Sequence, residues 1–266
     1  MSEKDIDQID QKLDKSRMRE KDRDTLKVIE SVFDFQTSML IVKLMNKGIL
    51  KEIGFVVSTG KEANVYHAYG PKNEELAIKI YRTTTAEFKR NWMYVEGDPR
   101  FKRYKKGTYA FIYTWAKKEF KNLQRMHKAN VRVPVPITVS KNVLVMEFIG
   151  KKETAAPLLK DVVIKKPQKV YSTIIEYLTR LYEDGNLVHA DLSEYNILYH
   201  NKEPILIDVS QAVLLDHPHA AVFLYRDIHN INRYFSSLGV QTLTNDELYE
   251  QITNSEPSPK IKAIEI

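Results

Sequence analysis

The feature that most constrains this chain is a set of three polar residues around two short apolar runs. Asp191 and Asn196 lie five positions apart, directly before the first run, and Asp208 follows the second run directly. The runs are Ile197-Leu198-Tyr199 and Ile205-Leu206-Ile207, separated by Asn201-Lys202-Glu203-Pro204. This pattern predicts a β-hairpin with Asn201-Lys202-Glu203-Pro204 as its turn. We therefore expect the three polar side chains to converge at the open end of the hairpin.

The three side chains have a common chemistry, because each carries an oxygen. Carboxylate and amide oxygens suit a hard cation such as Mg²⁺ bound together with phosphate oxygens. Asp191 would remain able to accept a proton from a substrate. The spacing matches the kinase catalytic loop and its metal-binding aspartate. The alternative is that these are turn and capping residues, as Asp and Asn often are.

A lysine upstream weakens that alternative. Lys79 lies inside the apolar run Leu76–Tyr81, where a cation is costly unless it is paired. Glu119 lies on the apolar stripe of a predicted helix around residues 112–126 and is the expected partner. Such a pair positions the phosphates of ATP in kinases. The alternatives are a snorkelling lysine on an edge strand and the rival partners Glu87 and Glu96.

The rest of the pattern predicts an α+β protein. Two short helices are expected before Gly48, and the later apolar runs alternate between strand and helix spacing. Thr244 with Glu247 predicts the capping box of a last helix. The expected strands are 55–57, 65–68, 76–81 and 143–148, and the expected later helices are 112–126, 170–184 and 219–238.

A small-residue turn precedes the second expected strand. Ser58 to Val65 is in register with the kinase pattern G-x-G-x-x-G-x-V, with Gly60 in place and Ser58 and Ala63 replacing the other two glycines. Small residues still let the backbone approach phosphates. It is not a Walker A loop, because Glu62 follows Gly60-Lys61. Gly60 alone is equally typical of an ordinary turn.

Composition excludes several classes. The 266 residues contain no cysteine, which excludes disulfides, thiolate metal sites and a cysteine nucleophile. Hydrophobic residues make up 43%, enough for a core. No apolar run approaches the roughly 20 residues of a membrane helix. The sequence therefore predicts a soluble, cytoplasmic protein without a membrane partner.

Positive charge is concentrated in residues 82–106. This segment has eight basic and three acidic side chains in a chain of net charge +6. Aromatic residues are interleaved, namely Trp92, Tyr94, Phe101 and Tyr104. Stacking on unpaired bases and phosphate contacts from Arg100, Lys102, Arg103, Lys105 and Lys106 would make this an RNA-binding segment. The alternative is a solvated loop.

Three motifs resemble the RIO family of atypical protein kinases. They are Ser-Thr-Gly-Lys-Glu-Ala-Asn-Val-Tyr at 58–66, His-Ala-Asp-Leu-Ser-Glu-Tyr-Asn at 189–196 and Ile-Asp-Val-Ser-Gln-Ala at 207–212. The resemblance is to the type-one subfamily, in the compact form seen in archaeal members, and runs from about Val32 to Gly239. It includes Glu96–Phe101, Met146-Glu147-Phe148 and Arg226-Asp227.

The resemblance implies a two-lobed kinase-like fold without an activation segment or peptide-binding helices. It also implies ATP, Mg²⁺ (or Mn²⁺), serine autophosphorylation, and action on the small ribosomal subunit precursor and its rRNA, with no DNA. Asp191 and Asp208 would be catalytic, Asp208 as a transient aspartyl-phosphate, and Asn196 and Asp208 would hold the metal. The implied ATP-binding residues are Ser58, Gly60, Lys61, Val65, Ala77, Lys79, Glu119, Met146, Glu147, Ile149 and Leu198, of which Met146, Glu147 and Ile149 line an adenine pocket floored by Leu198.

The expected organisation is a helical arm at 1–50, an N-lobe at 51–149 with a basic loop at 82–108, a C-lobe at 150–256 and a disordered tail at 257–266. Ala190 replaces the arginine of the kinase His-Arg-Asp motif, which argues against a phosphorylated activation loop. We expect His189 to brace the loop by packing, and Arg226 and Asp227 to be buried partners. Two other functions stay open: a small-molecule phosphotransferase of the antibiotic-kinase type, and a non-catalytic assembly factor switched by ATP.

Overall fold

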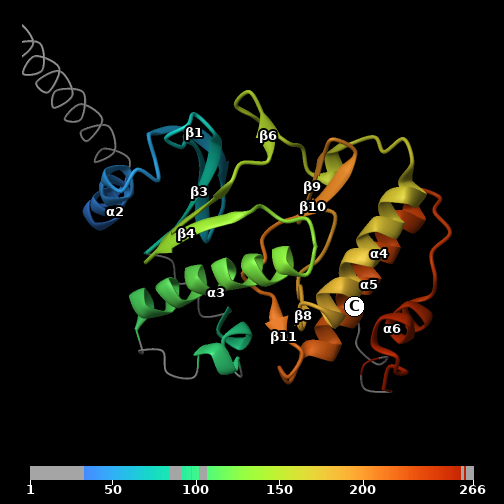
Figure 1. Cartoon of the computed structure of the whole chain (residues 1–266). Coiled ribbons are helices and arrows are strands. Elements are labelled where there is room, and N and C mark those ends of the chain that lie inside the picture. Colours follow the sequence, from blue (N-terminus) through green and yellow to red (C-terminus); the bar gives the residue numbers. More distant parts are fainter. Residues whose placement is uncertain (1–32, 84–90, 97, 102–106, 259–260, 262–266) are drawn as a thin grey trace, which may run out of the picture.

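The N-terminal lobe is built on one antiparallel sheet (Figure 1). A computed structural model describes residues 33–83, 91–96, 98–101, 107–258 and 261. The strand order is β1-β2-β3-β5-β4, and every neighbouring pair is antiparallel. Lys79 therefore lies on a central strand, so the edge-strand alternative is wrong. The strands are β1 (Glu52–Thr59), β2 (Ala63–Tyr69), β3 (Glu75–Tyr81), β4 (Pro136–Ser140) and β5 (Val143–Glu147).

Two helices cover the two faces of this sheet. Side chains alternate along a strand, so Leu76, Ile78 and Ile80 face α2 (Phe35–Asn46) in one apolar cluster. Lys79 and Tyr81 face α3 (Thr108–Lys128), which runs below the sheet in Figure 1. The lysine is thereby directed to the helix that carries its expected partner.

The first helix also tests a prediction. Where the sequence predicts two short helices before Gly48, the described residues contain one, α2, which ends just before Gly48 at φ 65°. Residues 1–32 of the predicted arm at 1–50, which include most of the first predicted helix, lie outside the described residues. Of the predicted disordered tail at 257–266, the structure describes Pro257, Ser258 and Ile261, and Ile261 is buried in the main apolar cluster, which disorder at this residue does not fit.

The C-terminal lobe is mainly helical. The helices α4 (Pro167–Glu183), α5 (Ala220–Ser237) and α6 (Asn245–Thr253) pack together, and α6 begins with the predicted capping box of Thr244 and Glu247. Short strands and one 3-10 turn complete it: β6 (Gly150–Lys151), β7 (Thr154–Ala155), η4 (Leu159–Asp161), β8 (Leu187–Val188), β9 (Ile197–His200), β10 (Glu203–Leu206) and β11 (Val213–Leu214).

The predicted hairpin is present, but its turn is tighter. Glu203 and Pro204 belong to β10, and only Asn201 and Lys202 form the turn. Both turn residues have positive φ, 52° and 67°, as a two-residue hairpin requires. The prediction was wrong because Pro204 was taken as a turn residue. Pro204 instead lies near the start of a strand in a two-stranded sheet, where its missing N–H is tolerated.

The lobes share one apolar core. Trp115, Ile112 and Met126 of α3 belong to the same cluster as Ile174 and Ile228 of the C-lobe. Only β11 and turns lie between Asp208 and α5. The fold is therefore the predicted two-lobed kinase-like arrangement without an activation segment. Among the described residues no helix is long and apolar enough to cross a membrane.

Part of the basic segment packs against α3. It contains η2 (Asn91–Tyr94) and η3 (Pro99–Phe101). Tyr94 is buried, Trp92 stacks on Phe111 at 5.5 Å between ring centroids, and Arg100 pairs with Asp98. Tyr94 and Arg100 are thus part of the fold, which corrects their prediction as RNA contacts. The other expected phosphate contacts, Lys102 to Lys106, lie outside the described residues.

Candidate active site

A cleft of about 680 Å³ separates the lobes. Thirteen predicted site residues line it; Asp191 is the one that does not. Their functional roles remain predictions, but the fold brings together side chains from β1, β2, β3, β5, α3 and the hairpin. The lining residues among them are Ser58, Gly60, Lys61, Val65, Ala77, Lys79, Glu119, Met146, Glu147, Ile149, Asn196, Leu198 and Asp208.

Lys79 makes two ion pairs in this cleft. Its Nζ lies 2.9 Å from the Glu119 carboxylate and 2.8 Å from Oδ1 of Asp208. Burial alone would lower the pKa of Lys79, but Asp208 and Glu119 outweigh it and raise that pKa. Lys79 is therefore a fixed cation, and it links the N-lobe sheet, α3 and the C-lobe.

Glu119 has a second partner that the sequence analysis missed. The buried hydroxyl of Tyr81 donates to Oε2 of Glu119. Burial raises the pKa of Glu119 to about 7, with the charge of Lys79 opposing the shift. The signal was available, because Tyr81 and Lys79 are two positions apart on a strand and share its face.

Asp191 and Asn196 form a compact loop. The Asn196 Nδ2 donates to the main-chain oxygen of Asp191 at 2.7 Å and to Asp191 Oδ2 at 3.1 Å. Burial, followed by the charge of Asp208, raises the pKa of Asp191 to about 6. Asp191 is thus poised to exchange a proton near neutral pH, as a general base requires.

Asp208 is perturbed in the opposite direction. The Lys79 ammonium holds the pKa of Asp208 below its usual range. Its backbone is left-handed, with φ 58°, which is uncommon for a residue other than glycine. His189 is fully buried, and its Nε2 is 3.2 Å from the main-chain oxygen of Ile207, the residue before Asp208. That contact fits the predicted bracing role of His189.

Arg226 and Asp227 bind the predicted catalytic loop, which fits their predicted structural role, although Arg226 is half-buried rather than buried. Asp227, fully buried, accepts from the backbone N–H of Ala190 and of Leu192, both at 2.8 Å. Arg226 donates to the main-chain oxygen of Ala190 at 2.5 Å. Neighbouring residues on a helix do not face each other, so each side chain has its own target. Burial raises the pKa of Asp227 to about 8, although the two N–H groups favour its ionised form.

The turn between β1 and β2 closes one side of the cleft. The Gly60 N–H donates to the main-chain oxygen of Ala63 at 2.9 Å, and Ser58 pairs with Val65 in the strand register. A Cβ on Gly60 would lie 3.0 Å from that oxygen, a close approach that favours glycine. The tight turn keeps its backbone at the cleft, where it could contact phosphates.

The connector between the lobes forms the inner wall. Glu147 lines the cleft, but its carboxylate is held by Arg132 through two bonds of 2.7 and 2.8 Å. The Glu147 side chain is therefore engaged within the fold, and its N–H also donates to the main-chain oxygen of Val135 at 2.8 Å. Ile149 and Leu198 pack together in a small apolar cluster, which suits a flat aromatic ring.

The donor set fits a magnesium ion completed by phosphate oxygens. Asp208 supplies a carboxylate that is about half exposed, and Asn196 supplies an amide. In the described part of the chain no group of three or more His, Asp or Glu side chains forms a ready-made metal cage. Mg²⁺ needs no such cage when the substrate brings phosphates.

The fold and these contacts are those of the protein-kinase-like class: a cleft between a sheet lobe and a helical lobe, a strand lysine paired with a helix glutamate, and two loop aspartates. The family model of the RIO domain matches residues 64–248. This chain belongs to the RIO family, as the sequence predicted.

Named relatives agree with that assignment. The chain is 45% identical over 251 residues to the serine/threonine-protein kinase RIO1 of Homo sapiens, covering 91% of this chain and 44% of that protein. It is 44% identical over 247 residues to the RIO-type serine/threonine-protein kinase Rio1 of Haloferax volcanii, covering 93% and 84%. The chain thus spans less than half of the human relative.

A solved structure shows the same fold. The Rio2 kinase of Chaetomium thermophilum, in an ADP/Mg²⁺-phosphoaspartate complex, has a TM-score of 0.61 and 20% identity, covering 85% of this chain and 72% of that one. At this identity the likeness concerns the fold alone.

Proposed function

We propose that this chain is an ATP-dependent serine kinase and ATPase that uses Mg²⁺. The observation that carries the proposal is the double ion pair of Lys79 with Glu119 and Asp208. A fixed cation at the cleft, next to two oxygen donors, suits a nucleotide whose phosphates meet both lysine and metal. The RIO1 names of its relatives support the same activity.

Each residue then has a distinct task. Lys79 orients the inner phosphates of ATP, and Glu119 with Tyr81 keeps Lys79 in place. Asp208 and Asn196 would hold the metal, which supplies charge neutralisation on the phosphates. Asp191 accepts the proton of the attacking hydroxyl, which its raised pKa allows.

We propose further that Asp208 is phosphorylated transiently. A carboxylate oxygen of Asp208 would form a bond to the γ-phosphorus as the bond to the bridging oxygen breaks, releasing ADP. Water would then attack the acyl phosphate, returning the carboxylate and inorganic phosphate. The carboxylate is ionised, about half exposed and in the cleft. The phosphoaspartate named in the Rio2 complex supports this chemistry by analogy.

Two variants test these roles. Asp208→Ala removes both the metal ligand and the acceptor, so ATP hydrolysis and any phosphoenzyme should disappear. Asp191→Asn should slow turnover by roughly 10²–10³-fold while nucleotide affinity, measured by calorimetry, changes little. Hydroxylamine should release the phosphate, because acyl phosphates are labile to it. A phosphate that resists hydroxylamine and maps only to serine would rule out the aspartyl-phosphate step.

The proposed partner is the RNA of a small ribosomal subunit precursor, met in the cytoplasm. Support comes from the charge of residues 82–106, with eight basic and three acidic side chains. Since Arg100 is paired with Asp98, the phosphate contacts are proposed for Lys102, Arg103, Lys105 and Lys106. Reversing these four charges should flatten the slope of log affinity against log salt by about 0.7–0.9 per lost contact. An unchanged slope on precursor particles would contradict RNA docking by this segment.

A further inference from the structure

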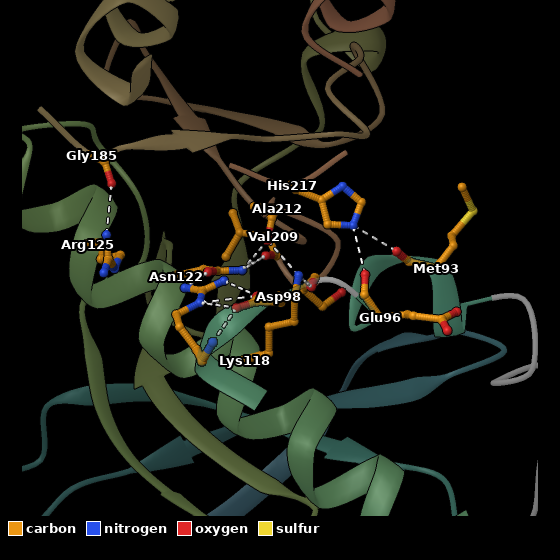
Figure 2. Close-up of polar contacts among 12 residues, drawn as sticks. Met93, Glu96, Asp98, Lys118, Asn122, Arg125, Gly185, Val209, Ala212 and His217 are labelled. Carbon is orange, nitrogen blue, oxygen red and sulfur yellow. Dashed lines mark hydrogen bonds and ion pairs between the residues drawn. The ribbon is translucent and has the colours of Figure 1, made fainter. Parts of the chain in front are cut away.

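Two polar side chains lie on the side of α3 that meets the C-lobe. Lys118 and Asn122 are one helical turn apart, and both are fully buried (Figure 2). Burying a lysine and an amide is costly, so an apolar residue would serve packing better. Their presence indicates that their N–H donors are needed there.

Both side chains donate to one short backbone segment, residues 209–212. The Lys118 Nζ donates to the main-chain oxygens of Ser210 at 2.8 Å and Ala212 at 2.5 Å. The Asn122 Nδ2 donates to the main-chain oxygens of Val209 at 2.8 Å and Ala212 at 3.0 Å (Figure 2). Side chains of α3 therefore bind three of the four main-chain oxygens that follow Asp208.

The orientation of the Asn122 amide is fixed from its other side. The Arg100 Nη1 donates to Oδ1 of Asn122 at 2.8 Å, so the amide nitrogen faces the 209–212 segment. Arg100 is in turn held by the buried Asp98 through bonds of 2.7 to 3.2 Å. The segment around η3 thus orients the Asn122 amide. We call the contacts from Lys118 and Asn122 to residues 209–212 the clamp.

We propose that Lys118 and Asn122 are positioning residues of the active site, which hold the backbone after Asp208 and, through Arg100, tie it to the 98–101 segment. The clamp explains how Asp208 keeps its left-handed φ of 58°, because such a conformation persists only when its surroundings impose it. Residues 209–212 belong to no helix or strand, so α3 supplies bonds that a sheet would otherwise supply.

The role in Mg²⁺ binding rests on the proposed function, but the clamp itself can be tested without nucleotide. Lys118→Met keeps the length of the side chain and removes both of its bonds. Asn122→Asp keeps the acceptor for Arg100 and removes the two donors to the segment. Arg125→Met is the matched control, since Arg125 on the same helix donates to the main-chain oxygen of Gly185 at 3.3 Å.

The first measurement is hydrogen exchange of the amides of 209–213 in the nucleotide-free protein. We expect exchange in this segment to rise at least about tenfold in Lys118→Met and in Asn122→Asp, the effect of about 1.4 kcal/mol. Arg125→Met should leave it unchanged. Exchange equal to wild type in either variant that folds would overturn the clamp, whether or not the chain hydrolyses ATP.

The second measurement is the Mg²⁺ concentration that gives half-maximal ATP turnover. Loss of a group that orients a metal ligand costs about 10–100-fold in metal affinity, so this concentration should rise by that factor in the clamp variants. Variants with a lower melting temperature and an unchanged Mg²⁺ requirement would show a merely structural role and overturn the positioning role. A wild-type protein without ATP turnover would instead contradict the proposed function and leave the exchange result to decide the clamp.

Discussion

The proposed catalytic loop at 189–196 and the proposed metal-binding segment at 207–212 are both held in uncommon backbone conformations, but by different parts of the fold. Each contains a non-glycine residue with positive φ, Ala190 at 68° and Asp208 at 58°. The first is held by Asp227 and Arg226 of α5, within its own lobe. The second is held by side chains of α3 and by Lys79, from across the cleft.

The two aspartates differ electrostatically in the same way. Burial raises the pKa of Asp191 to about 6, because the charge of Arg226 does not offset the loss of water around the carboxylate. Asp208 lies against Lys79, whose charge lowers its pKa. Asp191 can therefore exchange a proton near neutral pH, whereas Asp208 stays ionised. A shift of α3 relative to α5 would move the second aspartate relative to the first.

The largest expected effect comes from removing the cross-lobe cation. Lys79→Ala strands the buried carboxylate of Glu119, and removing one partner of a buried pair costs about 3–5 kcal/mol. ATP turnover should be lost. Glu119 already has a pKa raised to about 7, so at lower pH it is protonated and carries no stranded charge. The loss of stability in Lys79→Ala should therefore be smaller at low pH and largest at high pH. Urea unfolding at two pH values measures this.

An exposed lysine serves as control. Lys51 donates to Asn73 at 2.6 Å at the surface, so Lys51→Ala should change stability by no more than about 0.5 kcal/mol. If Lys79→Ala were as stable as Lys51→Ala and hydrolysed ATP normally, the cross-lobe pair would have no function.

The bonds from Asp227 to the 189–196 loop should affect a different kinetic quantity from the bonds that hold residues 209–212. Asp227→Asn leaves one buried N–H of the catalytic loop facing an amide nitrogen, and an unsatisfied buried donor costs about 1–3 kcal/mol. We expect kcat to fall with the Mg²⁺ requirement unchanged, which is the reverse of the clamp variants. Asn230→Ala is the milder control, since it removes only a 3.2 Å bond to the main-chain oxygen of Leu192. An altered Mg²⁺ requirement in Asp227→Asn would break the distinction between the regions.

The sequence predicted the pair of Lys79 and Glu119 because both are charged residues at positions where apolar ones are expected. Lys79 interrupts an apolar strand, and Glu119 interrupts the apolar stripe of a helix. The braces were harder to predict, since their targets are backbone atoms that carry no residue signature. Arg226 and Asp227 were predicted as buried structural partners, but nothing in the sequence showed that they would bind the backbone of the 189–196 loop. Lys118 is three positions after Trp115 and four before Asn122, so helix spacing contained a usable signal. The role of Arg100 depended on how a long loop packs, which no local period encodes.

The pH dependence should distinguish the two aspartates. Asp191 must be ionised to accept a proton, so with its pKa raised to about 6 the rate should fall about tenfold per pH unit below that value and level off above it. Asp208, with a lowered pKa, should add no limb in this range. The profile of kcat/KM at saturating Mg²⁺ measures this. Asp191→Asn is the control: a limb near pH 6 that survives in it comes from another group.

The smallest expected effect concerns the strained alanine of the catalytic loop. Ala190→Gly removes a left-handed cost of roughly 1–2 kcal/mol. It also loses a buried methyl group worth about 0.8 kcal/mol and adds about 0.5–1 kcal/mol of backbone entropy to lose on folding. These terms nearly cancel, so urea unfolding should show a change below about 1 kcal/mol, with turnover close to wild type.

Ala190→Val is the opposing variant. A branched side chain at a φ of 68°, in a site with no exposed surface, adds backbone strain to overpacking that typically costs about 1–3 kcal/mol by itself. The variant should be clearly destabilised and slow. If Ala190→Gly were destabilised as much as Ala190→Val, the methyl group rather than the bonds to Asp227 and Arg226 would hold the loop. The comparison of two regions that are each held by hydrogen bonds would then fail.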